Sequence, residues 1–354
     1  MRKKQTGTFQ VQRREARVAT GILAVCIAIG LLAVGQSEGS FNPISTGRMA
    51  VYSSDLERLM IVDGGEMTIL DAESLMEIVT ISLPGYGDEF GQPSISSDGL
   101  RLAASAMRSD VRVWSLPEGV EMARFEGSQH PLTRVYFTPS GRELVVVAGM
   151  RAELWDVATG EVLRLFEGAK RFVTAAALSP DGAVLVTGDT AGDIRLWNVH
   201  SGASVAEIDA HTGDVYALEF ITTGDRFVSA GRDGVIKLWD TAEPVEIRQI
   251  GTHSEAVVWV SASSDGRFVA SSSHDVTARI WDVEAGGSIA TLDLWEEIGP
   301  LSEPVPPPPG RPRFHSRVQG AEFGPGDSYL VVSYVSGYES LIGIWDLTDV
   351  LSRC

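Results

Sequence analysis

The sequence has few of the residues that build disulfides and metal centres. It contains two cysteines, Cys26 and Cys354, and six histidines among 354 residues. Cys26 lies inside an apolar segment and Cys354 is the last residue, so we expect no disulfide between them. The histidines are scattered, whereas zinc and iron–sulfur sites need clustered thiols or imidazoles. We therefore expect no metal and no cofactor.

Positive charge is scarce in most of the chain. The whole sequence has 29 Lys and Arg against 47 Asp and Glu, a net charge of -18. Residues 1–17 hold six of the basic residues and one acid, which leaves 23 basic and 46 acidic residues for the rest. A body this acidic repels phosphate backbones, so nucleic-acid binding is not expected.

Catalytic signatures are also missing. The sequence has no GxSxG elbow, HExxH helix or phosphate-binding loop. The stretch from Gly188 to Asp193 superficially resembles a calcium loop, but it lacks the later bidentate acid and is better explained as a hairpin turn. We therefore expect a protein that is not an enzyme.

One long apolar run is present, from Val18 to Gly35, and it contains no charge. As a helix it would span roughly 27 Å at about 1.5 Å per residue, close to the hydrocarbon core of a bilayer. With residues 1–17 as a basic cytoplasmic arm, it predicts a transmembrane anchor, or alternatively the apolar core of a signal peptide cleaved after Gly35. Either reading places the body outside the cytoplasm, in the periplasm or extracellular space, and a cleaved signal would make the protein secreted.

The remainder is one unit repeated. Six tryptophans end short alternating segments, at spacings of 41, 42, 42, 42 and 64 residues, and Asp or a similar residue usually follows. A related segment ends at Leu70, 44 residues before the first of them, which makes seven units. The six tryptophans are Trp114, Trp155, Trp197, Trp239, Trp281 and Trp345.

A glycine-containing turn precedes each tryptophan by 14 or 15 residues in the second to sixth units. The glycines are Gly99, Gly141, Gly182, Gly224 and Gly266. Glycine supplies the positive φ that tight turns need. Alternating apolar and polar residues between such turns predict short antiparallel strands.

Seven units of about 42 residues with this Trp-Asp ending resemble the WD-repeat β-propeller family. The resemblance implies an all-β fold of seven four-stranded antiparallel blades in one domain, over residues 46–350, preceded by one N-terminal transmembrane or signal helix. Only nine residues follow Trp345, so the last blade lacks a local fourth strand. Residues 36–45 are a linker or a closing strand, and they leave open whether the blade has three strands or four.

Two units hold His, Ser, Asp and Trp at identical offsets. These are His211, Ser229, Asp233 and Trp239, and then His253, Ser271, Asp275 and Trp281. The set resembles a catalytic triad, but a repeated triad with no oxyanion hole is not expected of an enzyme. In the WD-repeat family it implies a structural network in which the Ser oxygen accepts the indole N–H. Other units have lost parts of it, such as Ala169 and Ala191 in the fourth.

Two additions interrupt the last unit. A proline-rich insertion covers residues 295–317, and about three extra residues lie near Val335–Ser340. Pro306–Pro309 favour polyproline II and cannot join a sheet. We interpret the insertion either as an exposed spacer or as a docking segment or lid.

The resemblance also implies a binding face, formed by the inner hairpins and the connections between blades. Aromatic and arginine side chains are favoured anchors on such surfaces. The candidate partner-binding residues are Asp63, Met107, Thr190, Asp214, Tyr216, Arg232, His274 and Tyr338.

Together these features predict a non-catalytic, monomeric scaffold that binds a protein or peptide partner outside the cytoplasm. The alternative is a small-molecule-binding or hydrolytic propeller that uses its central cavity, which would require convergent acids there. Fold alone does not decide between them.

Overall fold

The computed structural model describes residues 41–45, 49–53, 57–63, 65–82, 93–106, 110–126, 132–294, 317–336 and 339–351. The predicted N-terminal helix, the proline-rich insertion, Met107 and Tyr338 lie outside these ranges. Within them, no helix is long and apolar enough to cross a membrane.

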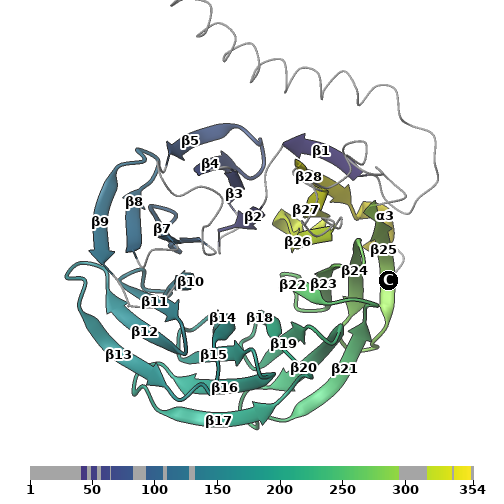
Figure 1. The fold of residues 1–354 in the computed structure, drawn as a ribbon. Coiled ribbons are helices and arrows are strands. Elements are labelled where there is room, and N and C mark those ends of the chain that lie inside the picture. Colours follow the sequence, from purple (N-terminus) through teal and green to yellow (C-terminus); the bar gives the residue numbers. More distant parts are fainter. Residues whose placement is uncertain are drawn as a thin grey trace, which may run out of the picture.

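The described chain forms seven four-stranded antiparallel sheets arranged around a central axis, as Figure 1 shows. The predicted all-β propeller of seven blades is therefore confirmed.

Blades 1 to 3 follow one another along the chain. Blade 1 consists of β2 (Met49–Tyr52), β3 (Arg58–Asp63), β4 (Glu66–Asp71) and β5 (Glu77–Ser82). Blade 2 consists of β6 (Ser94–Ile95), β7 (Arg101–Ala106), β8 (Asp110–Ser115) and β9 (Glu121–Glu126). Blade 3 consists of β10 (Leu132–Phe137), β11 (Glu143–Ala148), β12 (Arg151–Asp156) and β13 (Val162–Glu167).

Blades 4 to 6 repeat the pattern with little variation. Blade 4 consists of β14 (Val173–Leu178), β15 (Val184–Asp189), β16 (Asp193–Asn198) and β17 (Ser204–Asp209). Blade 5 consists of β18 (Val215–Phe220), β19 (Arg226–Gly231), β20 (Val235–Asp240) and β21 (Glu246–Thr252). Blade 6 consists of β22 (Val257–Ala262), β23 (Phe268–Ser273), β24 (Thr277–Asp282) and β25 (Ser288–Asp293).

Blade 7 draws its strands from both ends of the described chain. It combines β26 (Arg317–Phe323), β27 (Tyr329–Ser336) and β28 (Glu339–Asp346) with β1 (Phe41–Ser45), which pairs antiparallel with β28. The 3-10 helix η1 (Pro325–Asp327) joins β26 to β27, and α3 (Thr348–Leu351) follows β28. Blade 7 thus has four strands, and residues 41–45 are its closing strand. Because β27 and β28 have eight residues where the matching strands of blades 1 to 6 have six, the extra residues near Val335–Ser340 lengthen this hairpin.

The predicted turns between the first and second strands have the expected backbone. The glycines at their ends have φ between 63° and 75°, the left-handed region that other residues avoid. The stretch Gly188–Asp193 forms the hairpin between β15 and β16, where the Asp189 carboxylate accepts the backbone N–H groups of Ala191 (2.8 Å) and Asp193 (3.2 Å). This matches the hairpin interpretation.

The core lies between the blades rather than within each one. Each of seven buried apolar clusters joins residues from two neighbouring blades. The tryptophan at the end of each third strand packs into the cluster shared with the preceding blade, as Trp239 does beside Phe227 and Ala177. Burial of apolar surface therefore holds each blade to its neighbours.

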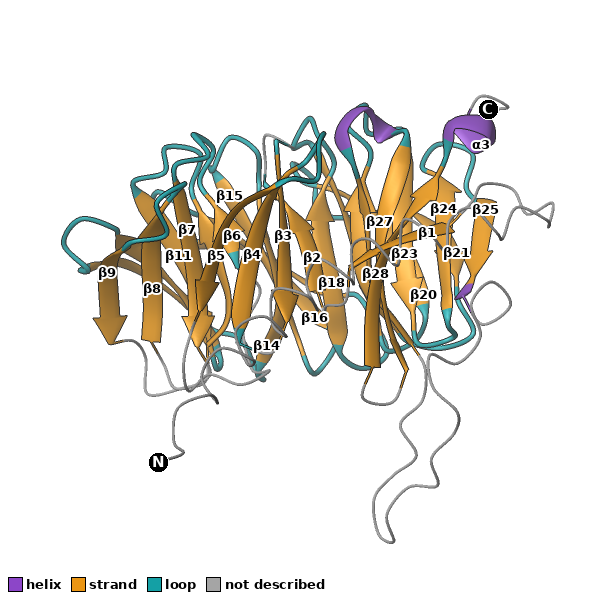
Figure 2. Cartoon of the chain, turned by 90° about the horizontal axis from the view of Figure 1, so that it is seen from above, coloured by secondary structure: helices purple, strands orange, loops and turns teal. Residues whose placement is uncertain are grey.

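The ring has two faces. The loop face carries the hairpins between the second and third strands and the connections from one blade to the next. The turn face carries the other two turns of each blade, together with η1 and α3 (Figure 2). The first strands of the blades lie nearest the central axis of the ring (Figure 1). The region around this axis, from one face to the other, is named the central channel.

Candidate functional site

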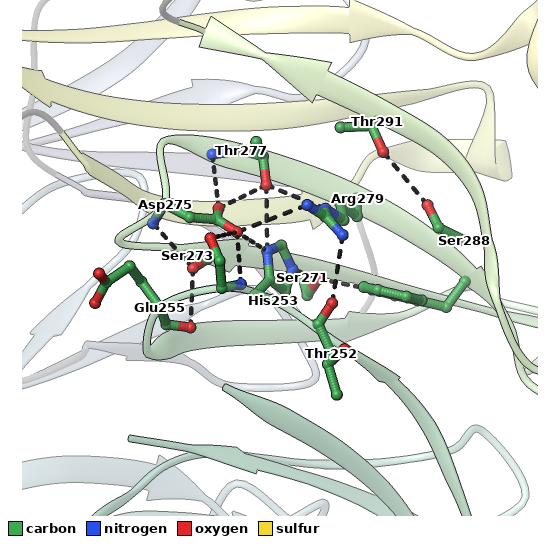
Figure 3. A network of polar contacts seen from close by, with 12 residues as sticks. Thr252, His253, Glu255, Ser271, Ser273, Asp275, Thr277, Arg279, Ser288 and Thr291 are labelled. Carbon is green, nitrogen blue, oxygen red and sulfur yellow. Dashed lines mark hydrogen bonds and ion pairs between the residues drawn. The ribbon is translucent and has the colours of Figure 1, made fainter. Parts of the chain in front are cut away.

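The four-residue set of blade 6 forms a continuous chain of hydrogen bonds. The indole Nε1 of Trp281 donates to Ser271 Oγ at 2.7 Å, and this hydroxyl lies 2.7 Å from His253 Nε2. His253 Nδ1 lies 2.9 Å from the Asp275 carboxylate, which also accepts the Thr277 hydroxyl (Figure 3). A carboxylate can only accept here, so Nδ1 carries the imidazole proton and Nε2 accepts from the serine.

Blade 5 repeats this geometry. Trp239 Nε1 donates to Ser229 Oγ at 2.8 Å, His211 Nε2 lies 2.7 Å from the same oxygen, and His211 Nδ1 lies 3.1 Å from Asp233. The two serines are fully buried and their oxygens are already occupied by the indole and the imidazole. A substrate cannot reach either hydroxyl, so neither set has the geometry of a nucleophilic site.

The backbone of each preceding blade holds the histidines in place. His253 N–H donates to the carbonyl of Gly234 at 2.9 Å, and His211 N–H donates to that of Gly192 at 3.1 Å. Both glycines have positive φ, and a Cβ at Gly192 would lie 2.0 Å from the carbonyl oxygen of His211. The close approach of the two blades therefore requires glycine at this hairpin.

Hydrogen bonds keep the carboxylates of both sets ionised. Burial opposes ionisation of Asp275, but bonds from His253 and Thr277 outweigh it and hold the pKa of Asp275 well below its usual range. The pKa of Asp233 is lowered in the same way, by the backbone of Thr212 and by His211. Burial lowers the pKa of His211, which favours its neutral form.

Blades 3 and 4 satisfy their tryptophans differently. Trp197 Nε1 donates to Thr187 Oγ1 at 2.9 Å, and Trp155 Nε1 donates to the buried carboxylate of Glu153 at 2.8 Å. Glu153 also pairs with Arg151 at 2.6 Å. Both acceptors replace the serine of the complete set, and the sequence reading identified neither.

The candidate residues of blades 4 to 6 form a regular row on the loop face. The backbone N–H groups of Thr190, Arg232 and His274 donate to the carbonyls of Phe172, Asp214 and Ala256, at distances from 2.9 to 3.0 Å. Each donor comes seven residues, and each acceptor 25 residues, before the tryptophan of its own blade. The row therefore contains Phe172, which is 57% exposed and which the sequence reading missed. Its shared offset with Asp214 is the signal that could have found it.

Blade 5 brings three of the candidates together. Arg232 is exposed and lies over Gly213, while Tyr216 is half-buried below it. Burial and the neighbouring Asp214 carboxylate raise the pKa of Tyr216, and Arg232 opposes the shift. Arg134 of blade 3 donates to the carbonyl of Tyr216 at 3.1 Å, which ties this cluster to the channel wall.

The remaining candidates are more scattered. Asp63 is exposed at the end of β3, on the far side of the ring from the row. His274 is half-buried, and its burial together with the positive charge of Arg317 lowers its pKa. No group of three or more His, Cys, Asp or Glu side chains in the described ranges could hold a metal ion.

A cavity of about 570 Å³ lies at the turn-face end of the central channel. It is lined by the ends of the first strands and the turns that follow them, including Tyr136, Glu219 and Glu322. Glu322 Oε2 accepts the backbone N–H of Tyr52 at 3.1 Å across the seam between blades 7 and 1. Sequence reasoning placed no binding residue at this end of the channel.

The comparisons with known proteins match the most regular blades. The family described as WD domain, G-beta repeat matches residues 160–198, 202–240 and 245–282. A stretch of 41 residues is 46% identical to pre-mRNA-processing factor 19 homolog 2 of Arabidopsis thaliana. That alignment covers 12% of this chain and 8% of the length of the plant protein. The three matched stretches contain both complete hydrogen-bonded sets and the whole row on the loop face.

Proposed function

Since the chain carries WD40 repeats in a seven-bladed β-propeller, we propose that it is a non-catalytic scaffold for a protein or peptide partner. The partner binds the loop face over blades 4 to 6. The observation that carries this proposal is the row of Phe172, Thr190, Asp214, Arg232 and His274.

The composition of this row suits recognition of a protein surface. Phe172 presents an apolar ring that is 57% exposed, and Arg232 presents a guanidinium that forms no ion pair with any described residue. Arginine and aromatic side chains dominate the binding energy of many interfaces. The expected partner places an apolar side chain against Phe172 and a carboxylate or carbonyl against Arg232.

Crosslinking in cells tests this surface. A photoreactive amino acid at position 172 or 232 of the full-length chain should capture one defined protein, and Arg232→Glu or Phe172→Ala should abolish its co-purification. Matched controls are Arg142→Glu on the turn face and Val245→Ala in the turn before β21, where Val245 is also 57% exposed. Equal loss in controls and row variants, with all variants folded, would exclude the loop face as the binding surface.

The compartment is part of the same proposal. The apolar run of residues 18–35 behind a basic arm supports display of the propeller outside the cytoplasm, either anchored or secreted. Cell fractionation, the N-terminal sequence of the mature protein and protease accessibility decide this. Cleavage of the blades only from the cytoplasmic side would reject the topology, and the crosslinking result would still stand.

A further inference from the structure

The cavity at the turn-face end of the channel is separate from the partner-binding row. At about 570 Å³ it has the size of a small-molecule site. Its wall combines the half-buried ring of Tyr136 and the exposed Pro139 and Pro180 with hydroxyl groups and the carboxyl groups of Glu219 and Glu322. The wall therefore offers apolar surface and carboxyl groups in one cavity.

At one repeated position of the channel wall, polar side chains form hydrogen bonds between blades. This position is the next-to-last residue of the first strand. Ser94 accepts the backbone N–H of Phe137 there, and Ser261 accepts that of Phe323. Glu322 accepts the N–H of Tyr52 in the same manner. Each of these bonds joins one blade to the next, so a polar residue at this position links neighbouring blades.

Glu219 occupies the same position in blade 5 but does not perform this task. Its carboxylate forms no hydrogen bond or ion pair with any described residue. The side chain is exposed, but its exposed surface faces the cavity inside the ring. The packing of the blades therefore gives no reason for a carboxylate here.

No basic side chain among the described residues forms an ion pair with the Glu219 carboxylate. The surrounding strands raise the pKa of Glu219 to about 7, which Arg134 opposes. Burial and the charge of Glu219 raise the pKa of Glu322 well above its usual value. Arg134 itself donates to the Tyr216 carbonyl and to the Tyr136 hydroxyl instead of forming an ion pair with Glu219.

We propose that this cavity binds an organic cation, an alkylammonium group whose charge lies between Glu219 and Glu322 and whose hydrocarbon stem contacts the apolar part of the wall. Such a ligand would pair with the Glu219 carboxylate, donate a hydrogen bond to the carboxyl group of Glu322 and place its stem against Tyr136 and Pro180. The source of the group is either a free diamine or the side chain of a lysine in a peptide. The proposal does not depend on the loop-face partner, because that surface lies at the other end of the channel.

Isothermal titration of the purified full-length protein tests the proposal with two probes, 1,4-diaminobutane and Nα-acetyl-lysine methylamide. At least one should bind, and Glu219→Gln should weaken that binding at least tenfold. Glu322→Gln should weaken it as well, while its amide oxygen can still accept the Tyr52 N–H. Glu243→Gln removes an exposed carboxylate from the outer rim and should leave the affinity unchanged.

A pH series adds a second readout. The ionised form of Glu219 is the one that binds a cation, so the affinity of the wild type should rise up to about tenfold between pH 6 and pH 8. Glu322 and Arg134 face the same space and are present in both the wild type and the Glu219→Gln variant. The variant should therefore largely lose the rise in affinity with pH. Thermal melts show whether each variant is folded.

Preference between the probes identifies the source, since diamine binding alone indicates a free metabolite and lysine binding alone indicates a peptide. Binding of neither probe overturns the proposal. Binding that is unaffected by both glutamine variants overturns it too, because the probe then binds elsewhere. If Ca²⁺ binds in a Glu219-dependent manner and neither amine does, the site is not one for an organic cation.

Discussion

Blades 3 to 6 each bury a tryptophan at the equivalent position, but its polar surroundings in blades 5 and 6 differ from those in blades 3 and 4. In blades 5 and 6 the indole N–H reaches a serine that belongs to a chain of four residues. In blade 4 a single threonine accepts it, and in blade 3 a glutamate does so from the tryptophan's own strand. The comparison teaches that the buried indole requires an acceptor, whereas its chemical identity can vary.

The two solutions differ in what else they connect. The Glu153 acceptor lies two residues from Trp155 and links only neighbouring positions of β12. The chain from Trp281 to Asp275 joins β23, β24 and the segment before β22, and the same segment is bonded to Gly234 of blade 5. Blades 5 and 6 are therefore coupled through polar contacts as well as through apolar packing.

The largest effect is expected for His253→Ala. It leaves the buried Asp275 and Ser271 without their central partner, and breaking such a buried pair costs about 3 kcal/mol of the free energy of unfolding. Urea unfolding followed by tryptophan fluorescence measures this loss. An equal loss from the Thr187 change described below would contradict the distinction between the two pairs of blades.

A smaller effect is expected for Glu153 in blade 3. Glu153→Ala should cost about 2 kcal/mol, because Trp155 loses its acceptor and Arg151 loses the nearer of its two carboxylate partners. Glu153→Gln keeps an acceptor for the indole and should cost about half as much. If both variants unfold at the same urea concentration as the wild type, Glu153 is not the required acceptor.

Thr187→Val in blade 4 is a smaller perturbation still. It preserves the shape of the side chain and removes one hydroxyl, so about 1 kcal/mol is expected from the indole left without its partner. Ser229→Ala in blade 5 is the matched change and should cost more, since it also disrupts the bond to His211. The difference between these two variants isolates the contribution of the extended chain.

The smallest effect is the response of blade 5 to acid. Because the pKa of His211 is lowered from 6.5 in the folded protein, the unfolded chain takes up a proton first as the pH falls. The contribution of His211 to the free energy of unfolding is complete above about pH 6.5 and is lost as the pH falls below that value. The lowered pKa of Asp233 adds a further loss of stability below about pH 3.8. His211→Gln should therefore flatten the dependence of the free energy of unfolding on pH between 7 and 5. A curve parallel to that of the wild type would contradict this assignment.

The sequence predicted the parts of the molecule that rest on local, repeated signals. The tryptophan spacing and the glycine-containing turns, such as the one at Gly182, locate the strands of every blade that has both signals. The strand at Phe41–Ser45 could not be predicted in this way, because it contains Pro43, lacks alternation and depends on pairing with β28. Pro43 is tolerated there because the strand lies at the sheet edge, where a missing N–H leaves no ladder bond unpaired.

The residues of the candidate sites also divide into those that have a repeated sequence signal and those that do not. Thr190, Arg232 and His274 could be located because each keeps a fixed offset from a tryptophan. Glu153 and Glu219 could not be recognised, because a charged residue in an alternating strand is normally exposed to bulk solvent. Their burial, or their position facing the cavity, follows from how neighbouring blades close around them.

The strand β1 also has a consequence for how the protein is made. Phe41 pairs with Trp345, so β1 leaves the ribosome before every other described strand and finds its partner only when β28 has been synthesised. During that interval the ring is an open arc, with one side of blade 1 uncovered and β1 without a sheet to join. The nascent protein therefore exposes unpaired strand edges until its last blade is complete, and pairing of β1 with β28 closes the ring.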